Sequence, residues 1–143
     1  MATNIDKFQP KDLEDAISFV LENAVNEESK EFFDKHENDE RGFVGELHHF
    51  FGQNLRNSWY LWWFANHKYE TWPAEKPLIV EWFNRHDIYH ADDMSSIILT
   101  STHRRYFNKP IELDKQIERF HKFWLKSVGN INPMSKEVIE DEE

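Results

Sequence analysis

The sequence predicts an all-α protein, and three observations support that fold class. Apolar residues recur at helical spacing in several separate runs, as in Leu13, Ile17, Val20 and Leu21. The 143 residues include only four glycines and five prolines, whereas a β-sandwich would need turn residues roughly every 8–12 positions. Twelve Phe, six Trp and four Tyr supply large apolar side chains for a core. We therefore predict a single compact bundle of five or six helices around one long central helix.

The predicted central helix runs from about Phe43 to Ala65. Its apolar stripe consists of Leu47, Phe50, Phe51, Leu55, Trp59 and Trp62. A second line on the same helix carries Gly45, His49, Gly52 and Arg56. Because a glycine inside a helix costs roughly 1 kcal/mol relative to alanine, the two glycines indicate that another backbone or a ligand comes close to this line.

The other predicted helices cover residues 10–25, 27–36, 78–85, about 17 residues from His90, and 114–128. Pro10 and Pro77 suit first helical positions. Asp92 and Asp93 suit the positive end of a helix dipole, and His90 stands where a capping residue is expected. The last helix is expected to stop at Gly129.

The formal charge of −10 is concentrated near the two ends of the chain. We expect residues 1–9 to be a loose leader, residues 10–129 to be a single helical domain, and residues 130–143 to be an acidic disordered tail. An acidic protein lacks the Lys/Arg footprint that duplex nucleic acid requires, so that partner is not expected. The acidic surface instead fits a solubilising role or a protein-binding adaptor or inhibitor.

Several other classes of site are disfavoured. The absence of cysteine excludes disulfides, thiolate nucleophiles and cysteine-based zinc sites. The sequence contains no Walker loop and no Gly-rich dinucleotide turn, so no cofactor is predicted. It also contains no apolar run of about 18 residues and no basic segment followed by an apolar one at its start. We therefore expect a cytoplasmic protein that is not embedded in a membrane.

A polar groove is predicted where the glycine-bearing line of the central helix meets the helix that follows His90. Its candidate ligand-binding residues are His49, Arg56, Asn57, Trp59, Asp92, Asp93, His103 and Arg104. A buried Arg56 needs a charged partner, and Asp92 or Asp93 is the expected one. A closed network would be structural, whereas a gap would hold a small polar ligand, a nucleotide or a partner segment. Because no hydrolytic motif accompanies these residues, we favour a non-enzymatic binding module.

A metal-dependent hydrolase is the main alternative function. His90, Asp92 and His103 have the chemistry of a mononuclear metal site that could activate water. The capping role of His90 is the simpler explanation, so no metal ligand and no catalytic residue is assigned. A Ser–His–Asp triad through Ser96 is rejected, because no Gly-x-Ser-x-Gly elbow surrounds that residue.

Two residue patterns stand out. They are Arg56-Asn57-x-Trp59-x-Leu61-Trp62 and His90-Ala91-Asp92-Asp93-Met94-Ser95, the second followed by Ile97-Ile98-Leu99 and His103-Arg104. Together they resemble a family of small bacterial and phage-encoded helical domains of unknown function, over about residues 45–125. The resemblance brings no catalytic residues, because that family has no agreed activity. It implies a counter-defence role, in which the protein sequesters a signalling nucleotide or blocks a defence protein. The chain differs from the family in its acidic leader and in a longer connection between Trp62 and Leu78.

Overall fold

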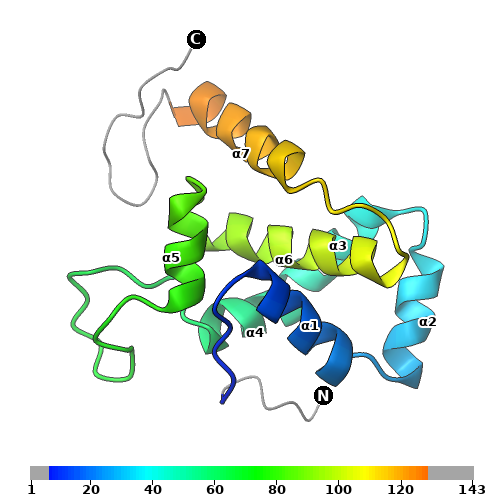
Figure 1. Ribbon diagram of the computed structural model, residues 1–143, viewed down its shortest axis with the longest axis horizontal. Helices are drawn as coiled ribbons and strands as arrows, with labels where there is room; N and C mark the ends of the chain where they lie inside the picture. The colour runs from blue at the N-terminus through cyan, green and yellow to red at the C-terminus, as the bar shows by residue number, and fades with distance from the viewer. Residues whose placement is uncertain (1–6, 129–143) are drawn as a thin grey trace.

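The computed structural model describes residues 7–128, and seven α-helices lie within that range. They are α1 (Leu13–Asn23), α2 (Glu27–Lys35), α3 (Glu40–His48), α4 (Phe51–Ser58), α5 (Leu78–Arg85), α6 (Ala91–Tyr106) and α7 (Leu113–Val128). Helices α1, α3, α4 and α7 all pack against α6, which crosses the middle of the molecule (Figure 1). The predicted all-α class is confirmed, with one helix more than predicted and with α6 as the central helix.

Helix α6 suits the centre because its buried residues are not confined to one side. Met94, Ile97, Ile98 and Leu99 are buried, and so are the small polar residues Ser95, Thr100, Ser101 and Thr102. A helix without a wide polar face is stable only when other elements surround it. The Thr102 hydroxyl donates to the Ile98 carbonyl (2.7 Å), which satisfies one of these polar groups inside the helix itself.

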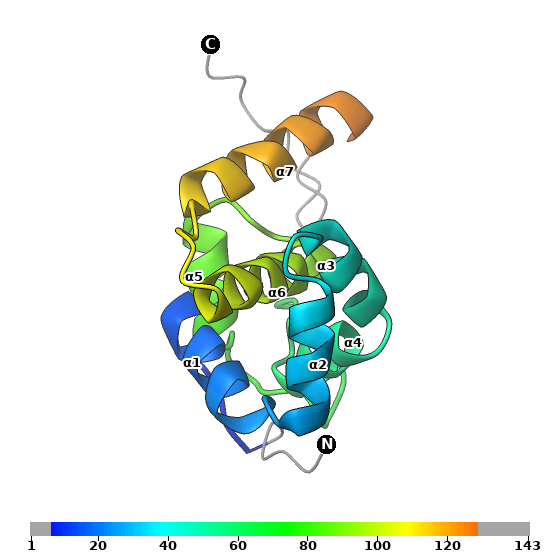
Figure 2. The same ribbon diagram turned by 90° about the vertical axis from the view of Figure 1, so that its right-hand side faces the viewer.

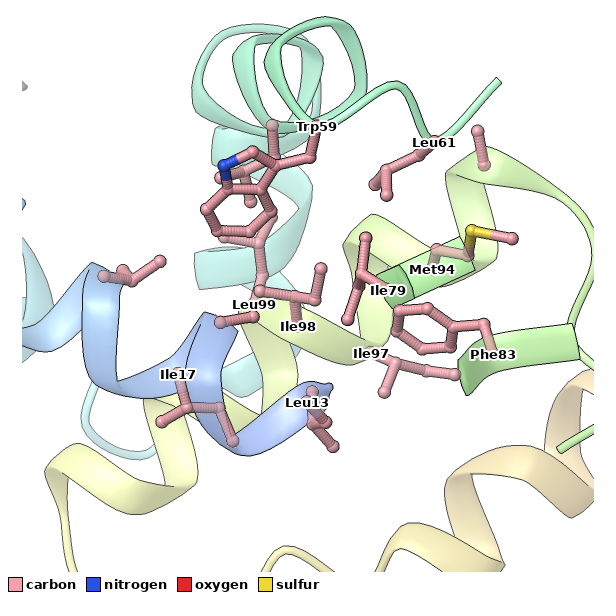
Figure 3. Packing of buried hydrophobic residues seen from close by; sticks show 14 of the residues in the cluster. Leu13, Ile17, Trp59, Leu61, Ile79, Phe83, Met94, Ile97, Ile98 and Leu99 are labelled. Atoms are coloured by element: carbon pink, nitrogen blue, oxygen red, sulfur yellow. The ribbon is translucent and has the colours of Figure 1, made fainter. Parts of the chain in front are cut away.

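The apolar core lies between α6 and three neighbouring segments. Ile79 and Phe83 enter it from α5, and Leu13 and Ile17 enter it from α1 (Figure 3). Trp59 and Leu61 enter it from the chain just after α4, and both are fully buried. Of the predicted leader, the structure describes residues 7–9, and Phe8 stacks on Phe19 with ring centroids 4.5 Å apart.

The predicted long helix from Phe43 to Ala65 is wrong, because the chain turns twice within it. Phe50 adopts φ −107° and ψ −83°, which separates α3 from α4. Helix α4 then ends at Ser58, because Tyr60 has φ +54° and the Leu61 N–H donates to the Arg56 carbonyl (2.9 Å). This is a Schellman end, in which glycine usually takes the left-handed position that Tyr60 occupies here.

Capping side chains mark the starts of α1, α2, α3 and α6. Helix α1 begins at Leu13 rather than at Pro10, because Asp12 caps it by accepting the Asp15 N–H (2.9 Å). His90 caps α6 as predicted, since its Nδ1 accepts the Asp92 N–H (3.1 Å). Gly129 and the predicted tail 130–143 lie outside the described residues, as do residues 1–6. None of the helices between residues 7 and 128 has the length and apolar character needed to cross a membrane.

Candidate functional site

Arg56 reaches the start of α6 because the chain turns sharply between α3 and α4. The Phe50 N–H donates to the Leu47 carbonyl (3.2 Å), and α4 begins one residue later. The turn brings the guanidinium of Arg56 back to the end of α3, where Nη2 donates to the His48 carbonyl (2.9 Å). The last carbonyls of a helix lack donors within the helix, so this side chain of α4 caps α3.

Gly52 leaves the space that the guanidinium occupies. A Cβ at position 52 would lie 3.0 Å from Arg56 Nη1 and 3.3 Å from the Leu47 carbonyl oxygen. The prediction that a glycine marks a close approach is therefore confirmed at Gly52. It is wrong at Gly45, where a Cβ would meet nothing within 4 Å. Gly45 lies on an exposed side of α3, and the break before α4 separates it from the line that carries Arg56.

The buried side chain of Arg56 stands at the centre of a polar network. Its Nη1 donates to Ser95 Oγ (2.8 Å), and its Nε lies 3.4 Å from Asp92 Oδ1. The predicted pairing of Arg56 with a carboxylate at the start of that helix is confirmed. Each of the three guanidinium nitrogens therefore has at least one oxygen of the protein within 3.4 Å.

Two histidines flank Asp92 without hydrogen bonding to its carboxylate. His48 Nε2 lies 3.9 Å from Asp92 Oδ1, and His90 Nδ1 lies 3.8 Å from Oδ2. Both distances exceed the range of a hydrogen bond. Burial, and then the positive charge of Arg56, lowers the pKa of His48, and these effects outweigh the opposing one of Asp92. These effects favour the neutral form of His48, and Arg56 is the permanent cation beside Asp92.

Asp93 belongs to a different contact, on the side of α6 that faces α7. The Trp124 indole N–H donates to Asp93 Oδ2 (2.7 Å). Burial raises the pKa of Asp93, and the bond from Trp124 only partly offsets that effect. Asp93 therefore joins α6 to α7 and does not face Arg56.

His103 and Arg104 lie near the opposite end of α6. His103 is 1% exposed, its Nε2 lies 2.8 Å from the His36 carbonyl oxygen, and its ring packs between those of Phe43 and Phe107. Arg104 donates through Nε to Glu40 Oε1 (2.6 Å) and through Nη1 to the Ile111 carbonyl. At 1.5 Å per residue, this end of α6 is about 15 Å from Asp93.

The predicted polar groove is therefore not formed. His49 and Asn57 are exposed, whereas Trp59 is fully buried in the core. The break after His49 removes that residue from the line of Arg56, and the remaining candidates divide between the two ends of α6. The alternative metal site of His90, Asp92 and His103 is not formed either. His90 and His103 are separated by about 20 Å along the axis of helix α6. Within residues 7–128, no three His, Asp or Glu side chains gather in a way that could hold a metal ion.

An apolar pocket of about 510 Å³ lies elsewhere, between α1, α2 and α6. In Figure 2, α1 and α2 stand on either side of this region, and α6 crosses above it. Its walls are formed mainly by apolar side chains of five helices and the α1–α2 connection: Val20, Ala24, Val25, Phe32, Phe33, Phe43, Leu47, Phe51 and Leu99. A volume of this size falls within the range of about 300–1,000 Å³ that is typical of small-molecule sites.

The floor of the pocket is buried, and its rim is exposed. Phe43 and Leu99 are each 1% exposed, and Phe33 packs on Phe43 with ring centroids 4.7 Å apart. The rim along α2 consists of polar or charged residues, Asn26, Glu28, Glu31 and Lys35. An apolar floor with a charged rim suits an amphipathic ligand, because the apolar part leaves water while the polar part stays hydrated.

A smaller hollow of about 340 Å³ lies between the segment that precedes α1 and the connection between α4 and α5. It is lined by Gln9, Pro10, Tyr60, Thr71, Trp72, Pro73, Pro77 and Leu78. Most of these residues come from irregular segments rather than from helices, so this hollow has a less firmly held wall than the pocket beside α2.

A family model described as Domain of unknown function (DUF6794) matches residues 9–106. The match covers α1 to α6 and contains all of the residues that line the larger pocket, while α7 lies beyond it. Among curated proteins and among solved structures, none matches this chain. The chain belongs to this family of domains of unknown function.

Proposed function

We propose that this protein is a non-enzymatic binding module whose site is the apolar pocket between α1, α2 and α6. The observation that supports the proposal is the pocket itself, an open hollow of about 510 Å³ with four phenylalanines in its wall. Exposed apolar surface costs free energy in water, roughly 25 cal/mol per Å², so an apolar guest that covers it gains affinity.

The pocket supports this function better than the polar network around Arg56 does. In that network each guanidinium nitrogen already contacts an oxygen of the protein, so a polar ligand would compete with existing contacts. A ligand that enters the pocket would not have to break hydrogen bonds of this kind. The apolar surfaces that face the hollow would gain van der Waals contacts with the ligand. The small polar or nucleotide ligand predicted for the groove is therefore replaced by a ligand with an apolar part.

The experiment is a titration with N-phenyl-1-naphthylamine, a neutral probe that fluoresces strongly only in apolar surroundings. We expect the wild-type protein to bind one probe molecule with saturable fluorescence. Ala24→Phe places a ring inside the pocket, because Ala24 lines it, and should abolish the signal. The matched control is Ala74→Phe, at an exposed position outside both hollows, which should retain it.

Circular dichroism and thermal unfolding of each variant establish that its helices are intact. Absence of saturable probe binding by the folded wild-type protein would contradict the proposal. Equal binding by Ala24→Phe and the wild-type protein would also contradict it, because the probe would then occupy some other surface.

A further inference from the structure

We infer that the occupant of this pocket is a basic amphipathic segment of a partner protein, which lies along α2 and inserts its apolar side chains between α1 and α6. This inference rests on the proposed function, because it names the partner of the same site. Three observations carry it: the charge of the surrounding chain, the shape of the rim, and the aromatic character of the wall.

The chain around the pocket is strongly acidic. Residues 20–47, which run from α1 through α2 and α3, contain nine Asp or Glu and three Lys or Arg, a formal difference of −6. Glu40 of this segment is paired with Arg104, which lies outside it, so a difference of −5 is left, out of −10 for the whole chain. Such a field attracts a cationic partner and repels an anionic one before contact is made.

The charges at the rim agree with that field. Glu28 and Glu31 border the pocket, and Lys35 is the one cation among the described residues that line it. A fatty acid or another anionic amphiphile would bring its carboxylate beside two carboxylates of the protein. A lysine or arginine of a partner would instead find acceptors there.

The shape of the rim favours a segment of protein over a single small molecule. The charged rim runs along α2, a helix of nine residues that spans about 13 Å at 1.5 Å per residue. A helix laid alongside could place several basic residues on this line while its apolar face enters the hollow. This is the helix-in-groove mode of recognition, in which anchors at helical spacing fill an apolar groove.

The wall adds a further attraction for cations. Phe32 and Phe51 line the pocket and are partly exposed, and the face of a phenyl ring carries partial negative charge. A Lys or Arg side chain that enters with its aliphatic stem along these rings keeps its charged end near Glu28 and Glu31. The same wall therefore accepts both the apolar and the basic side chains of the inferred partner.

The test is displacement of N-phenyl-1-naphthylamine by two synthetic amphipathic peptides that have leucines at identical helical spacing. One peptide carries lysine at all other positions, and the second carries glutamate. We expect the lysine peptide to displace the probe at a concentration at least about tenfold lower than the glutamate peptide, with the difference shrinking as salt is added. Decyltrimethylammonium, a small amphipathic cation, forms a third arm.

Charge reversal at the rim supplies the matched variants. In Glu28→Lys/Glu31→Lys the preference should reverse in favour of the glutamate peptide. In Glu70→Lys/Glu75→Lys, which makes the same change of net charge at exposed positions remote from the pocket lining, the lysine peptide should remain preferred. This control separates the local rim from the overall charge of the protein.

Three results would overturn the inference while leaving the proposed pocket intact. The first is displacement of the probe by the glutamate peptide at a concentration equal to or lower than that of the lysine peptide. The second is binding of the lysine peptide without loss of probe. The third is displacement of the probe by decyltrimethylammonium when neither peptide displaces it. If the probe itself does not bind the wild-type protein, the proposed function fails, and this inference fails with it.

Discussion

Gly52 and Arg56 lie one turn apart on α4, and the missing side chain of the first makes room for the guanidinium of the second. A Cβ at Gly52 would approach Arg56 Nη1 to 3.0 Å, while Nη1 is held by Ser95 Oγ at 2.8 Å. The glycine and the buried charge are therefore parts of one arrangement. Neither can change without affecting how α4 meets α6.

We predict that alanine has opposite effects at Gly52 and at Gly45. Gly52→Ala should lower the free energy of unfolding by about 1–3 kcal/mol, because Arg56 must give up part of its buried bonding. Gly45→Ala should raise it by up to about 1 kcal/mol, because helix propensity improves and a Cβ there meets nothing within 4 Å. Urea unfolding of both variants measures the difference. Equal effects at the two positions would show that Gly52 is not needed for close packing.

We predict that Arg56→Met costs more stability than Asp92→Asn. Arg56→Met removes the donor to the buried Ser95 hydroxyl and to the partly buried His48 carbonyl, which costs about 1–3 kcal/mol. Asp92 is 42% exposed in its side chain, so water screens its charge, and the amide oxygen of the asparagine variant can still face Arg56 Nε. Although Arg56 loses its counter-charge, we expect a cost of less than about 1 kcal/mol. Urea unfolding at one pH compares them. The reverse order would mean that the carboxylate, rather than the hydrogen bonds, holds Arg56 in place.

We predict that Asp93 makes the protein less stable as the pH rises. Burial raises the pKa of Asp93, so the folded state favours its neutral form. The stability that this form contributes is fully present below the unfolded pKa of about 3.9 and is lost as the pH rises through the higher folded pKa. Relative to the wild-type protein, Asp93→Asn should therefore gain stability with increasing pH over this window.

The measurement is the free energy of unfolding of both proteins between pH 3 and pH 7, with roughly half-unit steps. Asp34→Asn serves as the control, because its side chain is exposed and it lies on α2, away from the contact between Asp93 and Trp124. A difference between Asp93→Asn and the wild-type protein that stays constant with pH would contradict the assigned burial of the charge.

We predict that Asp87→Gly stabilises the protein by about 1 kcal/mol. Asp87 has φ +60°, and the Ile88 N–H donates to the Phe83 carbonyl (2.9 Å), so α5 ends in the same way as α4. Glycine adopts this left-handed conformation without steric cost, whereas alanine adopts it only at a steric cost. Thermal unfolding should therefore rank Asp87→Gly above the wild-type protein and Asp87→Ala below it. A destabilised glycine variant would show that the exposed bond from the Tyr89 hydroxyl to Asp87 outweighs the backbone strain.

Helical periodicity was sufficient to predict most of the elements, because it depends on neighbours within one turn. The predicted helix 78–85 has the bounds of α5, and the predicted helices 27–36 and 114–128 differ from α2 and α7 by one residue. The partner of Arg56 was also predictable, since a buried guanidinium requires a carboxylate and the sequence offers only Asp92 and Asp93 nearby.

The break between α3 and α4 was not predictable in this way, because it depends on a contact between residues eight apart. In a continuous helix Arg56 and the His48 carbonyl would be separated by about 12 Å, whereas the turn brings them to 2.9 Å. The apolar pocket was missed for another reason. Phe33 and Phe43 have the spacing of core residues, and nothing in that spacing distinguishes a ring that fills a core from one that borders a hollow.

The central claim is that the apolar pocket, and not the polar network at the start of α6, receives the ligand. The most direct measurement is a titration of isotope-labelled protein with N-phenyl-1-naphthylamine, followed through backbone amide chemical shifts. We predict progressive shifts at Ala24, Phe43, Leu99 and Thr102, which border the pocket, and unchanged amides at Arg56 and Asp92. Shifts centred on His48, Arg56 and Asp92, with the pocket residues unaffected, would contradict the account.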